Sequence, residues 1–115
     1  MEYMLLIYGR EADSRAMSEQ DRATLFEEYG SFTQGIVKSG NYKAGAPLQP
    51  TATATTVRVR NGKPVSTDGP FAETREQLGG YYLIEAKDLD EATSIAARIP
   101  GARTGSIEVR PIRRF

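Results

Sequence analysis

The sequence predicts an α+β domain, because several stretches alternate apolar and polar residues and two others carry apolar residues at helical spacing. In chain order these are a strand, a helix, strands that include a hairpin, a strand, a helix and a strand. At 115 residues the chain is long enough for one domain, residues 1–115. This order predicts a ferredoxin-like βαββαβ plan with an inserted β-hairpin: an antiparallel sheet with two helices on one face.

The first strand, residues 3–9, is apolar on both of its faces, and so is the strand predicted at residues 78–87. The two faces of the first strand are Tyr3, Leu5, Ile7 and Met4, Leu6, Tyr8. Two helices cover only one face of a sheet, so the other face requires a second cover. A second copy of the sheet would supply it, and we therefore expect a homodimer through the sheet face. The alternative is a monomer in which residues 41–56 cover that face.

The first helix is predicted from Ser18, a favourable N-cap with Asp21 three residues later, to about Ser39. Gly40 is a natural C-cap, and residues 10–17 read as polar, irregular chain. The apolar stripe of this helix consists of Leu25, Phe26, Tyr29, Phe32, Ile36 and Val37.

A β-hairpin is predicted around Asn61-Gly62, the dipeptide most typical of a two-residue hairpin turn. It joins residues 55–60 to residues 63–67, and alternation places Val57 and Val59 facing inward with the arginines outward. Before it, residues 41–50 alternate like a short strand, and the prolines there favour an edge position.

The second helix is predicted to begin at the N-cap Asp88, with Glu91 at the capping-box position, and to end at Pro100-Gly101. A closing strand follows at residues 106–112. The apolar stripe of this helix consists of Leu89, Ala92, Ile95, Ala96 and Ile99.

Composition excludes several kinds of chemistry. Lys and Arg total 15 and Asp and Glu total 15, so the formal charge is zero, which argues against nucleic acid and anionic membranes as partners. The chain has no cysteine and no histidine, so thiol chemistry, the commonest general base and the commonest metal ligands are missing. We expect no metal and no cofactor. No apolar run is long enough for a membrane span, which favours a cytoplasmic protein.

The stretch Asp68-Gly69-Pro70-Phe71 ends the hairpin with an abrupt turn. Asp68 either caps this turn or takes part in binding, and the sequence leaves both interpretations open. With residues 73–84 the stretch resembles the signature of the DGPF, or YCII-related, family. Residues 4–8, 55–60 and 107–112 also resemble the pattern of that family.

The resemblance implies a dimeric α+β barrel. A dimer with stacked sheets leaves clefts near the strand ends, where small ligands bind, and Asp68 is predicted to lie at a strand end. Some relatives carry a histidine–aspartate pair thought to be catalytic; Asp68 matches the aspartate, and nothing in this chain matches the histidine. Asp68 is therefore the candidate catalytic residue. The competing interpretations are that the strand tyrosines pack in the core and that Arg58 and Arg110 pair, across strands or in solvent, with Glu108 or another carboxylate. The candidate ligand-binding residues are Tyr8, Gly69, Pro70, Phe71, Tyr82 and Arg110.

Three functions are compatible with the sequence and the resemblance. The first is an isomerase-, lyase- or hydrolase-type enzyme that acts on a small molecule. The second is a non-catalytic ligand-sensing or regulatory partner, because family sequences often occur near sigma factors of the extracytoplasmic-function class. The third is an accessory dimerisation domain without a ligand.

Overall fold

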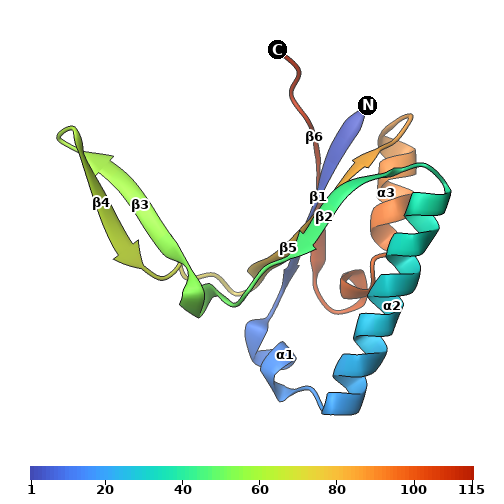
Figure 1. The fold of residues 1–115 in the computed structure, drawn as a ribbon, viewed down its shortest axis with the longest axis horizontal. Coiled ribbons are helices and arrows are strands. Elements are labelled where there is room, and N and C mark those ends of the chain that lie inside the picture. The colour runs from blue at the N-terminus through green and yellow to red at the C-terminus, as the bar shows by residue number, and fades with distance from the viewer.

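A computed structural model describes all of residues 1–115. The chain forms a main body from which a β-hairpin projects (Figure 1). The body contains a four-stranded antiparallel sheet in the order β2-β5-β1-β6. Its strands are β1 (Glu2–Gly9), β2 (Tyr42–Pro47), β5 (Gln77–Glu85) and β6 (Ser106–Pro111). This order is that of a ferredoxin-like βαββαβ plan, with β3 (Thr55–Arg60) and β4 (Lys63–Asp68) inserted as a separate two-stranded sheet. The predicted fold class is confirmed.

The two long helices, α2 (Glu19–Lys38) and α3 (Leu89–Ala97), lie on the same side of the sheet (Figure 1). Both predicted N-caps are confirmed. The Ser18 hydroxyl accepts a hydrogen bond from the Asp21 N–H at 3.0 Å, and the Asp88 carboxylate accepts one from the Glu91 N–H at 2.9 Å. Gly40 ends α2 with a φ of 83°, a conformation that glycine adopts without steric cost.

The prediction of irregular chain at residues 10–17 is wrong, because Glu11–Ala16 form a short helix, α1. Glu11 and Asp13 lie in its first turn and Arg15 in its last, so the charges complement the helix dipole. The helix buries no residue and therefore leaves no apolar periodicity in the sequence. The remaining helical turns are the 3-10 segments η1 (Thr51–Thr53) and η2 (Pro100–Arg103).

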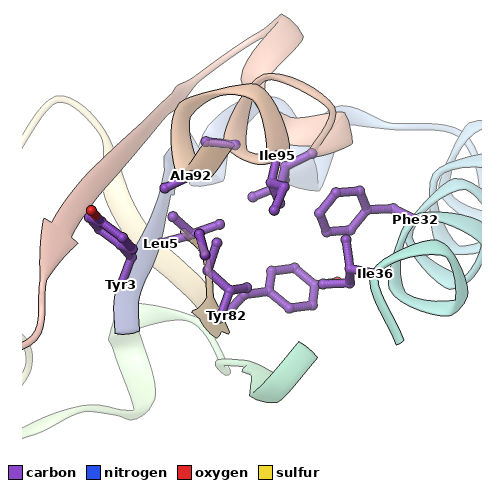
Figure 2. Close-up of a cluster of buried hydrophobic side chains, with 11 residues drawn as sticks. Tyr3, Leu5, Phe32, Ile36, Tyr82, Ala92 and Ile95 are labelled. Atoms are coloured by element: carbon purple, nitrogen blue, oxygen red, sulfur yellow. The ribbon is translucent and has the colours of Figure 1, made fainter. Parts of the chain in front are cut away.

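The hydrophobic core lies between the sheet and the two long helices (Figure 2). Leu5 and Ile84 of the sheet and Ile36 of α2 are completely buried. Burying one such side chain contributes about 1.5–3 kcal/mol to stability. The core consists of Tyr3, Leu5, Phe32, Ile36, Tyr82, Ile84, Ala86, Ala92, Ile95, Ala96 and Ile99.

Three residues assigned to the helix stripes do not face this core. Phe26 is 81% exposed, and Val37 and Leu89 are each 54% exposed. Phe26 and Val37 are eleven residues apart, which places them on one side of α2. Phe32 and Ile36 contact the sheet from a different side of the helix. The predicted stripe was therefore wider than the part of α2 that the narrow sheet covers.

The face of the sheet opposite the helices carries no helix, and we call it the open face. Cross-strand register places Leu6 beside Tyr81 and Glu108 on this face. The alternative cover by residues 41–56 is wrong, because Tyr42–Pro47 pair with β5 as an edge strand of the same sheet. The open face consists of Met4, Leu6, Tyr8, Ala44, Ala46, Tyr81, Leu83, Glu108 and Arg110.

The hairpin of residues 55–68, which we call the arm, projects away from the body (Figure 1). Its predicted turn is confirmed: Asn61 and Gly62 have φ values of 52° and 76°, as a type I′ turn requires. Val57 and Val59 are 61% and 62% exposed, so the prediction that they face inward is wrong for the single chain. The radius of gyration is 16.0 Å, whereas a compact domain of this length has about 13 Å.

Candidate functional site

The turn at residues 68–71 is fixed to the base of the arm by backbone geometry. Asp68 is the last residue of β4 and lies opposite Thr55. The next residue, Gly69, has a φ of 101°, which side chains other than glycine rarely allow. Its N–H donates to the Ala54 carbonyl at 2.7 Å, and its carbonyl accepts from the Thr56 hydroxyl at 2.8 Å. The glycine therefore locks the turn in place and determines where Asp68 stands.

The side chains of this turn are free in the single chain. Asp68 is exposed, and its carboxylate accepts no hydrogen bond and forms no ion pair, so it does not cap the turn. Pro70 is exposed, and Phe71 is 77% exposed. An acidic group and an aromatic ring thus stand in solvent, close together in sequence, at the base of the arm.

A second group of polar residues lies on the open face, on strands β1 and β6. The Arg110 guanidinium donates to Glu108 Oε2 at 3.1 Å, so Arg110 pairs with a carboxylate of its own strand, one of the partners that the sequence left open. The Tyr8 hydroxyl makes a longer contact of 3.4 Å with Glu108 Oε1. Glu108 therefore joins two candidate ligand-binding residues, Tyr8 and Arg110, which we call the Tyr8–Glu108–Arg110 cluster. The alternation of residues 106, 108 and 110 is the sequence signal that places both charged groups on one face.

The structure separates the remaining candidate, Tyr82, from both groups. Tyr82 lies on the helix-covered face, where its ring packs edge-on against Phe32 at 5.2 Å between centroids (Figure 2). Its hydroxyl is 2.7 Å from the Thr33 hydroxyl. Burial raises the pKa of Tyr82 above its usual value, with the Thr33 hydrogen bond acting in the opposite direction. In this chain Tyr82 is a core residue with a satisfied hydroxyl, as the packing interpretation of the tyrosines predicted.

A third polar contact, which the sequence did not reveal, holds the chain just before the arm. The Glu11 carboxylate accepts from the Thr51 hydroxyl at 2.7 Å and from the Thr51 N–H at 2.8 Å. The Glu11 N–H donates to the Gln77 side chain at 2.9 Å. The two Thr51 hydrogen bonds lower the pKa of Glu11, and the bond from the Thr51 hydroxyl has a larger effect than the bond from the Thr51 N–H. The two residues are 40 positions apart, and no pattern in the sequence indicates that they are in contact.

The chemistry available on the open face combines an apolar floor with a polar end. Met4, Leu6 and Leu83 supply apolar surface, and Tyr81 supplies an aromatic ring. The side chains of Arg110 and Glu108 are 67% and 42% exposed, so both can bind a polar ligand group. No group of three or more acidic residues is arranged to hold a metal ion. None of the helices is both long and apolar enough to cross a membrane.

The sheet order, the two helices on one face and the inserted hairpin define a ferredoxin-like α+β protein. Comparison with known families gives the more specific assignment. The YCII-related domain matches residues 1–115, and the chain belongs to this family. It is 39% identical over 114 residues to an uncharacterised protein of Rhizobium meliloti (strain 1021), covering 97% of this chain and 92% of that protein.

Among solved structures, the chain resembles that of 5-chloro-2-hydroxyhydroquinone dehydrochlorinase from Burkholderia phenoliruptrix, which was determined in complex with 2,5-dihydroxybenzoquinone. The TM-score is 0.55 at 14% sequence identity, with 100% of this chain and 96% of that chain covered. At this identity the similarity shows a shared fold.

Proposed function

We propose that the protein is a homodimer that binds a small molecule in a cleft between the open faces of two sheets. The observation that carries this proposal is the open face, which is apolar over β1 and β5 and lacks a covering helix. Water contact with such a face is unfavourable by about 25 cal/mol per Å² of apolar surface. A second copy stacked on it would remove this cost, and stacked sheets leave clefts near their strand ends.

The side chains at the cleft favour a small ring with hydroxyl or anionic substituents. Leu6, Leu83 and Tyr81 would contact the ring, because apolar and aromatic side chains line most small-molecule sites. Arg110 would donate to an anionic or carbonyl oxygen, and Glu108 would accept from a hydroxyl group. A protein of the same fold that forms a complex with a dihydroxylated quinone supports this ligand class.

Asp68 is the carboxylate that we propose for acid–base chemistry in an isomerase-, lyase- or hydrolase-type reaction. It has no partner in its own chain, and a carboxylate within reach of a substrate proton can act as a general base. If the protein binds a ligand without converting it, the ligand-sensing function is the correct alternative.

The first test measures mass and ligand binding separately. Light scattering after size exclusion should give twice the mass of the 12.7 kDa chain, and a monomer at all concentrations would contradict the dimer. A thermal-shift panel of hydroxylated aromatic acids and quinones, 2,5-dihydroxybenzoquinone included, should contain compounds that raise the melting temperature. Absence of any such compound would contradict the ligand site and favour the accessory-domain alternative.

The variant Arg110→Ala tests the cluster with the same panel. Loss of a charged hydrogen bond should weaken ligand binding by about 10- to 100-fold. Lys63→Ala, which removes a cation from the arm, is the matched control and should leave the affinity unchanged. Turnover that is lost in Asp68→Asn would support an enzyme, whereas unchanged turnover would remove Asp68 from the mechanism.

A further inference from the structure

We infer that the arm of each protomer reaches across to the other protomer and packs its Val57–Val59 face along the rim of the partner's open face. Asp68 lies on the same face of the arm and would thereby turn toward the partner's cleft. The site would then combine residues of both chains. This inference rests on the proposed homodimer and adds to it which segment completes the interface.

The arm lacks support from its own chain. Its two strands form a sheet of their own, and its apolar side chains Val57, Val59 and Val65 are 61%, 62% and 47% exposed. An isolated two-stranded hairpin is at best marginally stable in water. The segment is nevertheless rich in β-branched residues and carries a well-formed Asn61-Gly62 turn, both of which specify strands. The sequence of the arm strongly favours two strands, yet no side chain of these strands is buried by the rest of the chain. We therefore expect a surface of another molecule to cover them.

The two faces of the arm differ in charge, and the difference identifies the docking face. Register pairs Val57 with Ser66 and Val59 with Pro64, so these residues share one face with Thr55 and Asp68. That face has a single charge, at the base of the arm. The opposite face carries all three cations of the arm, Arg58, Arg60 and Lys63. Desolvating three cations is costly, so the Val57–Val59 face is the one that packs against another surface.

The area available on the sheet supports a second copy as the occupant. Four strands about 4.8 Å apart and about 20–25 Å long give the open face roughly 400–500 Å². A stable interface buries about 800 Å² per partner, so the sheet alone falls short. One face of the arm measures about 20 by 10 Å. Because each protomer would both give and receive an arm, two arm contacts add roughly 400 Å² per protomer and close the gap.

The shape of the molecule agrees with this exchange. The arm leaves the body at η1 and extends outward, so its tip is far from the sheet of its own chain (Figure 1). The excess radius of gyration comes from this extension. A two-fold axis that stacks the open faces requires both arms to contact a partner in the same way. The chain therefore provides both the projecting segment and a matching apolar surface.

Dimer affinity tests the inference by comparing the two faces of one strand. The double variant Val57→Ser/Val59→Ser should raise the dimer dissociation constant at least tenfold in analytical ultracentrifugation. Arg58→Ser/Arg60→Ser changes the opposite face of the same strand and should leave the constant within about twofold. Circular dichroism should show an intact body for both, because no arm residue belongs to the core.

The outcomes separate the two proposals. A wild-type dimer whose affinity does not change in Val57→Ser/Val59→Ser would overturn the arm contact and leave the sheet-face dimer standing. A wild-type protein that stays monomeric would overturn the dimer itself, and the arm inference with it. Equal weakening by both double variants would also contradict the assignment of the docking face.

Disulfide trapping locates the contact directly, because the chain has no cysteine of its own. A chain with Val59→Cys is mixed with a second chain that carries Ala46→Cys on β2 or Arg110→Cys on β6, the two rims of the open face. We expect a mixed disulfide with at least one of the two. Gln34→Cys, exposed on α2, is the control and should give none. Cross-linking to Gln34→Cys alone would place the arm elsewhere and overturn the inference.

Discussion

The sheet of the body and the sheet of the arm both consist of antiparallel strands, yet their apolar side chains differ in how far they are covered. Leu5 of β1 is completely buried, whereas Val59 of β3 is 62% exposed. Both residues lie in antiparallel strands and are paired with a residue of the neighbouring strand. The comparison teaches that alternation determines which side chains share a face, and that the surrounding chain determines whether this face is covered.

The largest expected effect comes from truncating matched apolar residues in the two sheets. Leu5→Ala should lower the free energy of unfolding by about 2–5 kcal/mol, because it removes a fully buried side chain and leaves a cavity. Val59→Ala should change it by less than about 0.5 kcal/mol when measured where the protein is monomeric. Urea titrations of both variants at low protein concentration give these values. Comparable losses would show that the arm is integrated into the cooperative unit of the body.

A pair of glycines provides a sharper comparison within the body. A Cβ at Gly45 would lie 2.8 Å from the Tyr82 ring and 3.0 Å from the Tyr81 carbonyl. Gly45→Ala should therefore destabilise the fold by about 1–3 kcal/mol. At Gly35 in α2, a Cβ would meet no atom within 4 Å beyond the adjoining backbone of its own helix, so Gly35→Ala should stabilise the helix by up to about 1 kcal/mol. Thermal denaturation compares the two, and a stabilising Gly45→Ala would contradict the close packing of β2 on β5.

The smallest expected effect is a local, pH-dependent one where the arm joins the body. The Thr51 hydrogen bonds lower the pKa of Glu11 in the folded chain. The contact is therefore complete above the ordinary carboxylate pKa of about 4.3 and is lost as the pH falls through the lowered value. The protection factor of the Thr51 amide in hydrogen exchange should fall below that point, with little change in global stability.

The variant Glu11→Ala should show the same low protection factor of the Thr51 amide at neutral pH and lose its dependence on acid. Asp13→Asn, in the same helix turn, is the control and should keep the pH dependence of the wild type. Unchanged protection of Thr51 in Glu11→Ala would show that another contact holds this segment.

The sequence predicted features that depend on local chemistry and failed where the outcome depended on distant surfaces. Ser18, Asp88 and Asn61-Gly62 act within a few residues of themselves, and all three were predicted correctly. The inward direction of Val57 depended on whether the hairpin joins the main sheet, which alternation cannot specify.

The candidate site shows the same division. The pairing of Arg110 with Glu108 follows from two residues on one strand face and was among the predicted alternatives. The placement of Tyr82 on the helix-covered face, away from Tyr8, follows from the covering of the sheet by α2. Both faces of β5 are apolar in sequence, so the pattern alone gave no reason to choose between them. The Glu11–Thr51 contact joins the first residues of two short helical segments, α1 and η1, that are far apart in sequence, and it left no pattern at all.

The separation of the arm from the core also has an evolutionary consequence. Because no residue between positions 55 and 68 contributes to the hydrophobic core, mutations there escape the constraint that close packing imposes on the body. The tip at Asn61-Gly62 can lengthen, shorten or change charge while the body still folds. Under the arm contact that we propose, related chains could diverge in their choice of subunit partner through this one segment, and the products of duplicated genes in one cell could stop forming mixed dimers without losing stability.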